Sequence, residues 1–557
     1  MKLISMVILV HLLAWPVRAQ SPRTLPAPKQ DQCRLSGMVV KLAGSEPLRK
    51  ARVRLQSVDE PTHSIAVVTD EAGRFELKGL DPGHYRLTAS RLGYVASEYG
   101  QRKASDPGAV LTLRAGQEMK DLLFRLVPAA IIAGRILDDD SEPLPGVTVS
   151  ALREVYSEGK RSLTTSTTAE TNDLGEYRLY GLAPGRYFVS AVFPQWNRFG
   201  DANESEDTTA SSQGYAKIYF PGTPEAAKAI SFSVKAGEEI PSVEMLMQQV
   251  PVYRVRGHVY NQITHKPGTG TTVIVTARTQ NHEWDSGFKH ADVQKQDGSF
   301  EIPEITPGSY VLTAMWFDEG QMYSTTLPIE VGRADVEGIA VTISQGVNIS
   351  GQIVWEGKPR LERDELTVTA VPVGLNFVFQ GGARVSQGDS FILRNVGDGT
   401  YHAELAGESK DCYIKDVRYA GSSVIDDGFT VVRGAPASLQ ILISPNGADV
   451  KGAVSDANGL PVAGVWVVLV PSAPRRGQHR LYKKQTTDQY GHFDLTGIEP
   501  GDYMLFSWDE VEDGAWEDAD FLKPFEEKGE NVAVQEGDSK GINLTTIVIS
   551  SIDQKKQ

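Results

Sequence analysis

The chain has 557 residues, of which 23% are charged and two are cysteines, and its formal net charge at pH 7 is −15. One hydrophobic core rarely serves a chain of this length, so several domains are expected. An acidic chain repels phosphate backbones, and two distant cysteines cannot form a disulfide framework. Neither a nucleic-acid-binding protein nor a disulfide-stabilised scaffold is therefore expected.

The first residues have the three parts of a secretory signal peptide. A basic start at Lys2 is followed by an apolar run over 3–15 and by the small-residue pattern Val17-Arg18-Ala19. We therefore predict a signal peptide over 1–19 and a linker over 20–32. The apolar run is too short to stay as a membrane anchor, and no later stretch reaches the length of a membrane helix. The mature chain is expected to be exported to the periplasm, the cell surface or the medium, without a transmembrane segment.

Five units follow, and each opens with the pattern apolar-x-Gly-x-apolar on a predicted strand. Alternating apolar residues, the period of a half-buried β-strand, come next, for example at Val147-Val149-Ala151 and Val465-Val467-Leu469. A pattern that returns at intervals of about one hundred residues indicates tandem domains. The five opening patterns are Leu35-Gly37-Val39, Ile132-Gly134-Ile136, Val255-Gly257-Val259, Ile349-Gly351-Ile353 and Val450-Gly452-Val454.

The strongest repeated element is a predicted β-hairpin. An Asp or Asn that can bond its own backbone, together with a Gly that supplies positive φ, reverses the chain before the first strand. A Pro-Gly pair then turns the chain again, and two inward aromatic residues stand ten residues apart. The fourth unit lacks the Pro-Gly pair and is the divergent copy. The residues that define the hairpin are Gly73, Phe75, Pro82, Gly83, Tyr85, Gly175, Tyr177, Pro184, Gly185, Tyr187, Gly298, Phe300, Pro307, Gly308, Tyr310, Phe391, Tyr401, Gly491, Phe493, Pro500, Gly501 and Tyr503.

The predicted fold class is all-β, a tandem array of five Ig-like or transthyretin-like β-sandwich domains. One short helical turn is expected at 224–229, inside a long loop. Linkers of a few residues should leave the domains abutting in series with limited hinge freedom. The tyrosines at the end of each hairpin are expected to bond backbone with their hydroxyls. The predicted boundaries are 33–128, 129–250, 251–346, 347–446 and 447–551.

These motifs together resemble the carboxypeptidase regulatory-like domain, a transthyretin-like β-sandwich. The resemblance is strong in units one, two and five, fair in three and weak in four. In zinc carboxypeptidases this domain accompanies a catalytic domain whose metal site begins with His-x-x-Glu, and none of the ten histidines here starts that pattern or His-Glu-x-x-His. Catalytic residues, metal ligands and cofactors are therefore not expected. Similarity to collagen-adhesin and starch-binding sandwiches implies surface or polysaccharide roles. The Lys–Asn bond of the adhesin relatives would need Lys451, Asn543 and an acid that the sequence does not identify.

Aromatic residues in the loops after the hairpins are the candidate binding residues, because sugar rings stack on exposed aromatics and such loops commonly form binding surfaces. The favoured alternative is that they fold over the strand ends as a secondary core. The segment 508–520 adds seven acids in thirteen residues and two tryptophans. It offers oxygen ligands to calcium or a cationic partner, although a solvated acidic loop is the preferred interpretation. The candidates are Tyr99, Trp196, Tyr219, Trp316, Trp508 and Trp516.

The resulting prediction is an exported, non-catalytic, multi-domain binding protein of the envelope or exterior. Its expected partner is a polysaccharide or an envelope protein, bound through the loop aromatics. The alternative is a purely structural stalk, spacer or adhesin, and a third hypothesis is an accessory to, or relative of, a peptidase.

Overall fold

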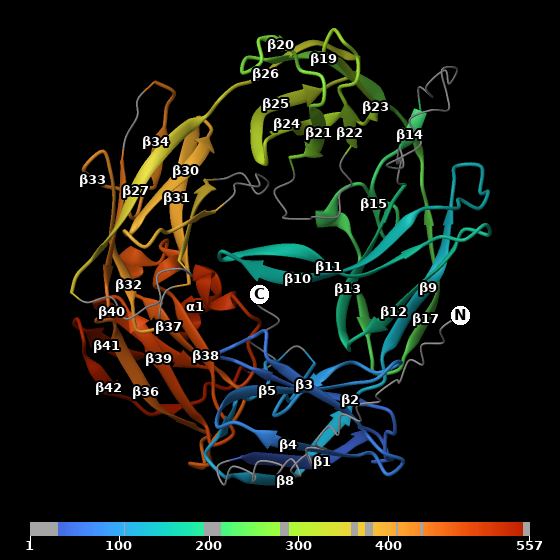
Figure 1. The fold of residues 1–557 in the computed structure, drawn as a ribbon. Helices are drawn as coiled ribbons and strands as arrows, with labels where there is room; N and C mark the ends of the chain where they lie inside the picture. The colour runs from blue at the N-terminus through green and yellow to red at the C-terminus, as the bar shows by residue number, and fades with distance from the viewer. Residues whose placement is uncertain are drawn as a thin grey trace, which may run out of the picture.

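The computed structural model describes residues 32–104, 106–193, 213–278, 289–357, 366–373, 382–407, 410–434 and 438–549. These residues form five β-sandwiches, named here domains 1 to 5 in chain order, as the sequence predicted (Figure 1). The predicted signal peptide lies outside the described residues. Both cysteines, Cys33 and Cys412, are buried, and no disulfide joins them.

Domains 1 and 2 each consist of two packed sheets. The opening strand β1 of domain 1 lies between β4, which is antiparallel to it, and β8, which is parallel to it. The second sheet has the order β3-β2-β5-β6, with β7 also pairing β5, and domain 2 repeats the plan. The strands of domain 1 are β1 Cys33–Lys41, β2 Arg52–Ser57, β3 Ser64–Val68, β4 Arg74–Leu80, β5 Gly83–Ser90, β6 Ser97–Glu98, β7 Leu111–Leu113 and β8 Glu118–Leu126. The elements of domain 2 are β9 Ala130–Leu137, β10 Thr148–Ser157, β11 Lys160–Glu170, β12 Glu176–Leu182, β13 Gly185–Val192, β14 Gln213–Tyr215, β15 Ile218–Tyr219, the 3₁₀ turn η1 Ala226–Lys228, β16 Phe232–Val234, β17 Glu239–Leu246 and β18 Gln249–Pro251.

Domains 3 and 4 follow the same plan. The 3₁₀ turn η1 in domain 2 confirms the helical turn expected at 224–229. The strands of domain 3 are β19 Tyr253–Asn261, β20 Lys266–Pro267, β21 Thr272–Ala277, β22 Lys289–Asp292, β23 Ser299–Ile305, β24 Gly308–Asp318, β25 Gln321–Val331 and β26 Val336–Ile343. Those of domain 4 are β27 Val347–Trp355, β28 Thr367–Pro372, β29 Ala383–Arg384, β30 Ser390–Val396, β31 Gly399–Ala406, β32 Tyr413–Tyr419, β33 Ser422–Ser423, β34 Phe429–Val431 and β35 Leu439–Ser444.

Domain 5 adds short helices to the sandwich, most of them after β40. Its elements are β36 Ala448–Ser455, β37 Trp466–Pro471, η3 Ala473–Arg475, η4 His479–Leu481, β38 Lys483–Thr486, β39 His492–Ile498, β40 Gly501–Ser507, η5 Ala515–Glu517, α1 Ala519–Leu522, η6 Lys523–Lys528, β41 Glu530–Val534, β42 Ser539–Gly541 and β43 Leu544–Thr545. We call residues 509–528 the cover segment, because its helices lie over the outer face of the sheet β38-β37-β40-β41.

The Asp-x-x-Gly turn before the hairpin in domains 1 and 5, which has Asn172 in place of Asp in domain 2, has a local cause. In domain 1, the Asp70 carboxylate accepts the backbone N–H groups of Ala72 at 2.9 Å and of Arg74 at 2.8 Å. Gly73 has φ +71°, and a Cβ there would lie 2.6 Å from the carbonyl oxygen of Val39. Only glycine therefore fits this corner. The turn fixes where the following strand begins.

The tyrosine at the end of each hairpin bonds the backbone four residues earlier, as the sequence predicted. The hydroxyl of Tyr85 donates to the carbonyl of Asp81 at 2.9 Å. A repeated side-chain bond at the same corner holds each second turn in place. The other four bonds are Tyr187 to Ala183 at 2.9 Å, Tyr310 to Thr306 at 2.8 Å, Tyr401 to Gly397 at 3.0 Å and Tyr503 to Glu499 at 2.8 Å.

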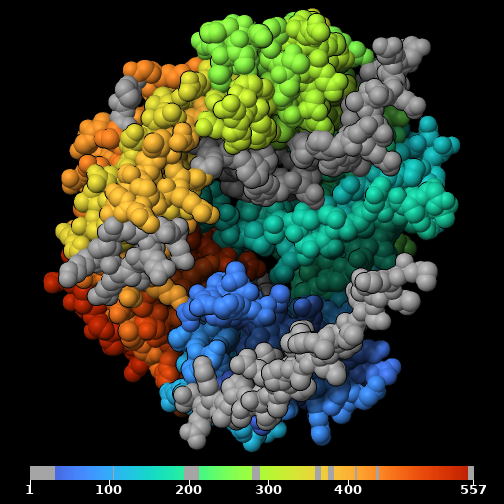
Figure 2. Space-filling view, viewed as in Figure 1, coloured from blue at the N-terminus to red at the C-terminus, as the bar shows by residue number. Residues whose placement is uncertain are grey.

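The five domains do not form an extended row. They follow one another around a closed ring, so that the first and last domains meet (Figures 1 and 2). The long hairpin β10–β11 of domain 2 extends across the ring towards α1 of domain 5 (Figure 1). The sequence predicted domains in series with short linkers, and that order is kept, but the contact between its ends was not foreseen.

Candidate ligand cleft at the ring closure

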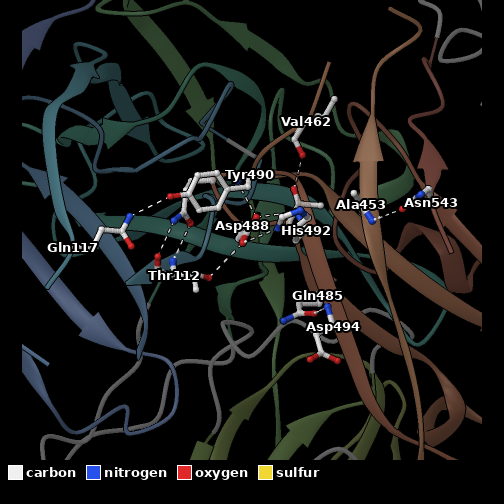
Figure 3. Close-up of polar contacts among 12 residues, drawn as sticks. Thr112, Gln117, Ala453, Val462, Gln485, Asp488, Tyr490, His492, Asp494 and Asn543 are labelled. Carbon is white, nitrogen blue, oxygen red and sulfur yellow. Dashed lines mark hydrogen bonds and ion pairs between the residues drawn. The ribbon is translucent and has the colours of Figure 1, made fainter. Parts of the chain in front are cut away.

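The contact between domains 1 and 5, which we call the seam, is formed at the edge strand β7. The backbone N–H of Thr112 donates to Oε1 of Gln489 at 2.9 Å, and Nε2 of Gln489 donates to the carbonyl of Thr112 at 2.8 Å (Figure 3). Beside them, Nε2 of Gln117 donates to the hydroxyl of Tyr490 at 3.1 Å. Val110 and Asp488 form a parallel β-bridge. The seam therefore extends the hydrogen bonding of domain 1 into domain 5.

The seam residues of domain 5 come from its Asp-x-x-Gly turn. Asp488 accepts the backbone N–H groups of Tyr490 and His492, both at 2.8 Å, so its carboxylate holds the turn closed (Figure 3). The two middle residues, Gln489 and Tyr490, are then presented outward. In domain 1 the equivalent turn residue, Glu71, instead pairs with Arg49 of the same domain. One copy of a repeated structural turn has thus become a contact between domains.

Ion pairs join further points around the seam. Lys103 of domain 1 pairs with Glu510 of the cover segment, and Lys410 of domain 4 pairs with Asp59 of domain 1. His84 Nδ1 lies 3.2 Å from the Asp59 carboxylate. The hydrogen bond from Lys410, more than the contact with His84, lowers the pKa of Asp59 below its ordinary value. Because these side chains are largely exposed, the pairs orient the domains more than they stabilise them.

A cleft of about 370 Å³ lies beside the seam and is formed by both domains. Trp466 of β37 supplies its aromatic wall, and domain 1 supplies every other lining residue. Since the wall and the polar residues come from opposite ends of the chain, the cleft exists only while the ring is closed. The lining residues are Arg86, Thr88, Ala96, Ser97, Glu98, Gln101, Asp106, Pro107 and Trp466.

The polar lining is held in place by bonds within domain 1. Nη1 of Arg86 donates to Glu98 Oε2 at 2.9 Å, and the backbone N–H of Gly108 donates to the same oxygen at 3.2 Å. Gln101 accepts the backbone N–H of Glu98 at 3.0 Å and donates to the carbonyl of Asp106 at 2.8 Å. These groups are fixed before any ligand arrives, which lowers the entropic cost of binding.

Trp466 is half-buried and points to the outer face of β37, opposite the core residues Val465 and Val467. Its ring lies 5.6 Å from that of Trp516 in an edge-on arrangement, and Lys484 Nζ lies 5.2 Å from its centroid. The contact with Trp516 thus holds the indole of Trp466 in position. Trp466 was not among the sequence candidates, although its place on the outer face follows from the alternation along β37.

The structure places the predicted aromatic residues mostly in packing positions. Trp508 and Trp516 are each 1% exposed and Tyr219 is 6% exposed, so none of them offers a free face to a sugar in this conformation. Tyr99 is half-buried, with its ring 6.2 Å from Phe124, and Trp316 packs 5.4 Å from Tyr323. Trp196 lies outside the described residues. Burial of this kind agrees with the secondary-core alternative.

The acidic segment of domain 5 is not a solvated loop, which corrects the preferred interpretation from sequence. Trp508, Trp516, Phe521 and Phe525 form a hydrophobic cluster over Val468, Val470 and Phe506. Several of its carboxylates have partners: Asp513 pairs with Lys484 at 2.5 Å, Glu517 contacts His479 at 2.7 Å, and Asp518 caps α1. No group of three or more His, Cys, Asp or Glu in the described ranges is placed to hold a metal ion.

The tip of hairpin β10–β11 lies against this segment. Tyr156 packs 6.5 Å from Phe521, and its hydroxyl accepts a bond from Nε of Arg161 at 2.9 Å. A Cβ on Gly159 would lie 2.6 Å from the carbonyl oxygen of Glu517, so the backbone of the tip rests directly on the cover segment. Domain 2 therefore braces domain 5 from across the ring, and we call this hairpin the strap.

The residues considered for a Lys–Asn bond have other partners. Lys451 Nζ lies 3.2 Å from Asp494, and its side chain is 48% exposed. Asn543 accepts the backbone N–H of Ala453 at 3.1 Å (Figure 3). Both side chains are thus engaged in other contacts, so the arrangement does not favour a Lys–Asn bond.

Taken together, the fold and the cleft define a closed array of transthyretin-like β-sandwiches with a ligand-sized cleft between its first and last members. Residues 34–126 and 131–217 match the model of the carboxypeptidase regulatory-like domain. Domains 1 and 2 are therefore two tandem members of that family, as the motifs predicted. No match was found among curated protein sequences. None of the helices in the described ranges is long and apolar enough to cross a membrane.

Several solved structures are similar to parts of the chain. The TIE protein of Bacillus anthracis is 15% identical over 56% of this chain and 51% of its own, with a TM-score of 0.16, so the match spans about half of that protein. The minor pilin GBS52 of Streptococcus agalactiae is 12% identical over 39% of this chain and 96% of its own, with a TM-score of 0.22. The major pilin BcpA of Bacillus cereus is 11% identical over 56% and 99%, with a TM-score of 0.14. Similarity at this level carries no argument about function.

Proposed function

We propose that this chain is an exported, non-catalytic binding protein that holds a saccharide unit of a polysaccharide in the cleft between domains 1 and 5. The observation that carries the proposal is the placement of the half-exposed indole of Trp466 in one cleft with Arg86, Glu98 and Gln101. Export rests on the signal-peptide pattern of residues 1–19.

The lining has the chemistry that a sugar ring requires. The apolar face of a pyranose packs on an indole, while guanidinium, carboxylate and amide groups bond its hydroxyls from the side. A volume of about 370 Å³ lies at the lower end of the range for small-molecule sites. The cleft therefore suits one or two sugar units rather than a long chain segment.

The two carboxyl residues of the cleft do not support a hydrolase. A glycosidase needs one carboxyl group that stays protonated, usually in an apolar pocket. Glu98 is instead ion-paired with Arg86, and Asp106 accepts the backbone N–H of Lys103 at 3.1 Å. Binding without turnover is the function that this arrangement favours.

The second candidate is a structural role, supported by the ring closure itself. The seam, the ion pairs and the strap join domains that are far apart in sequence, as a rigid spacer between two partners would require. In that case the cleft would be a by-product of domain packing. A stalk of this kind would be compact rather than extended.

A glycan array probed with the mature chain separates the two candidates. We expect binding to a restricted set of glycans, and we expect Arg86→Met to weaken it about tenfold or more, since it removes one charged hydrogen-bond donor. Trp466→Ala should act similarly, and Tyr260→Ala, an exposed aromatic in domain 3, is the matched control. Binding that survives both cleft substitutions, or no binding to any glycan, would leave the structural role.

A further inference from the structure

The outer edge of the second sheet in domain 1 differs from the same edge in the other four domains. In each domain, the second sheet ends in a strand that pairs only with the strand before it in the chain. These edge strands are β3, β11, β22, β29 and β38. Four of these strands carry Lys or Arg, at Lys160 and Arg161, at Lys289, at Arg384, and at Lys483 and Lys484. Strand β3 has the sequence Ser-Ile-Ala-Val-Val and carries no charge.

Charged side chains on edge strands, lysine above all, prevent sheets from pairing edge to edge. Four domains of this chain have that protection and domain 1 does not. The apolar side chains of β3 are also accessible, since Ile65 is 49% exposed and Val68 is 63% exposed. An uncharged, exposed, β-branched edge is the feature by which a sheet accepts another strand.

The backbone of β3 is set to pair in this way. The backbone N–H of Ser57 donates to the carbonyl of His63, and the backbone N–H of Thr69 donates to the carbonyl of Ala51. The backbone N–H and C=O groups of the odd-numbered residues of β3 therefore point towards β2. Hydrogen-bonding direction alternates along an antiparallel strand. The N–H and C=O groups of Ser64, Ala66 and Val68 therefore point away from β2, towards the free edge.

We propose that β3 is a self-association edge, at which two copies of the chain pair antiparallel about Ala66. In this register Ala66 lies opposite Ala66 of the second copy, and Ile65 lies opposite its Val67. Ile65 and Val67 stand on the face that packs towards the core, opposite Leu55 and Val53 of β2. Pairing would thus continue the apolar face of domain 1 across the two-fold axis and cover the exposed part of Ile65.

A second copy is the occupant that the charge pattern favours. Pairing β29 or β38 with itself would bring Arg or Lys of one copy close to Arg or Lys of the other, whereas self-pairing of β3 brings no charges together. The nearest charges on that sheet, Arg52 and Arg54 of β2, would be three strand spacings, or about 14 Å, from their counterparts. Salt screens charges at that distance, because the Debye length is about 8 Å at physiological ionic strength.

A five-residue edge buries much less surface than a standard interface, so we expect a weak and reversible dimer. Sedimentation velocity of the mature chain, from about 5 µM to about 500 µM, should show a monomer–dimer equilibrium in that range. A chain that stays monomeric throughout overturns the proposal. Circular dichroism of each variant below confirms that it is folded.

Substitutions at Ala66 test the register without disturbing the core, since this residue is exposed and lies opposite Arg54 on β2. Ala66→Glu gains a cross-strand ion pair with Arg54 but sets two carboxylates face to face in the dimer, so we expect it to be monomeric. Ala66→Lys should also be monomeric, and an equimolar mixture of the two variants should recover the dimer as a heterodimer.

The matched control is Thr168→Glu, on the exposed side of the equivalent edge strand β11, which should leave the dimer unchanged. A dimer that persists in Ala66→Glu, or a mixture of the two variants that stays monomeric, would show that the copies do not pair about Ala66. Loss of the dimer in the control would show that charge alone, rather than this edge, governs association. The test uses no glycan, so it is independent of the cleft.

Discussion

The side-chain amide of Gln489 makes the two hydrogen bonds to the backbone of Thr112 that a neighbouring β-strand would make. One amide thereby satisfies both the donor and the acceptor of an edge-strand residue 377 positions away in sequence. The seam holds the first and last domains together without a disulfide. It is therefore the part of the ring that a single substitution should affect most clearly.

Gln489→Ala should loosen the seam. It leaves the N–H and C=O of Thr112 without their side-chain partner, at a cost of about 1–3 kcal/mol for part-buried groups. We expect hydrogen exchange at β7, residues 111–113, to accelerate about tenfold or more. Gln485→Ala is the control, because Gln485 accepts the backbone N–H of Asp494 within domain 5. Equal exchange at β7 in the two variants would show that the seam does not depend on the amide.

The ion pair between Lys103 and Glu510 should report ring closure in the unmodified chain. A carbodiimide joins an ammonium and a carboxylate only when they touch, so we expect an isopeptide cross-link between these residues in the monomer fraction. The pair Lys41–Glu46 within domain 1 serves as the positive control. Lys103→Arg keeps the charge but should abolish the product. A positive control that reacts while Lys103–Glu510 does not would contradict the closed ring.

Gly159→Ala should detach the strap from the cover segment. Gly159 has φ +70°, and an added Cβ would stand 2.6 Å from the Glu517 carbonyl oxygen, so both the backbone and the contact oppose the substitution. We expect faster hydrogen exchange over 512–522 and a red shift in tryptophan emission, because Trp516 belongs to that segment and Trp508 is buried against it.

The hairpin β24–β25 supplies a matched control for this experiment. Gly320 has φ +77°, close to that of Gly159, but nothing lies within 4 Å of an added Cβ. Gly320→Ala therefore carries the same backbone strain, about 1 kcal/mol, without the collision. If both substitutions change the hydrogen exchange over 512–522 and the tryptophan emission equally, the strap does not brace the cover segment.

Local chemistry explains which features could be predicted from sequence. The Asp-x-x-Gly turn and the tyrosine bond four residues back each depend on residues close in the chain, so their pattern repeats and can be recognised. The seam depends on Gln489 meeting Thr112, and nothing near either residue in sequence indicates the other. Repeats specify domains, whereas the arrangement of the domains depends on surface residues that differ between copies.

The sequence contains a signal for the cover segment in strand β37. Residues 466–470 of β37 are apolar at every position, Trp-Val-Val-Leu-Val. A strand with one solvent-exposed face should instead alternate between apolar and polar residues. Such a run requires a second apolar layer, and the tryptophans of 508–520 supply it. The same reasoning would have placed Trp466 on the outer face, beside the cleft.

The stability of domain 3 should depend on pH through Lys289 of β22. This side chain is 25% exposed, donates to the carbonyl of Glu304 and lies 3.6 Å from the Glu304 carboxylate. Burial lowers its pKa to about 8, against the raising effect of Glu304. Between about pH 8 and the ordinary value of 10.5 the unfolded chain binds this proton and the folded chain does not. The free energy of unfolding should therefore rise with pH across that window, and the cost of the buried charge is fully present below pH 8.

Carbon-13 NMR of the lysine side chains would measure this pKa directly. We expect one resonance to titrate near pH 8, and Lys289→Met to remove it together with the rise in stability above pH 8. Lys266→Met, an exposed lysine of the same domain, should change neither. Because a lysine in water titrates near 10.4, a Lys289 resonance that moves only above pH 10 would mean that the ammonium stays hydrated in the folded chain. In that case its bonds to the backbone of β23 would stabilise the domain at every pH below 10, and the slope would be absent.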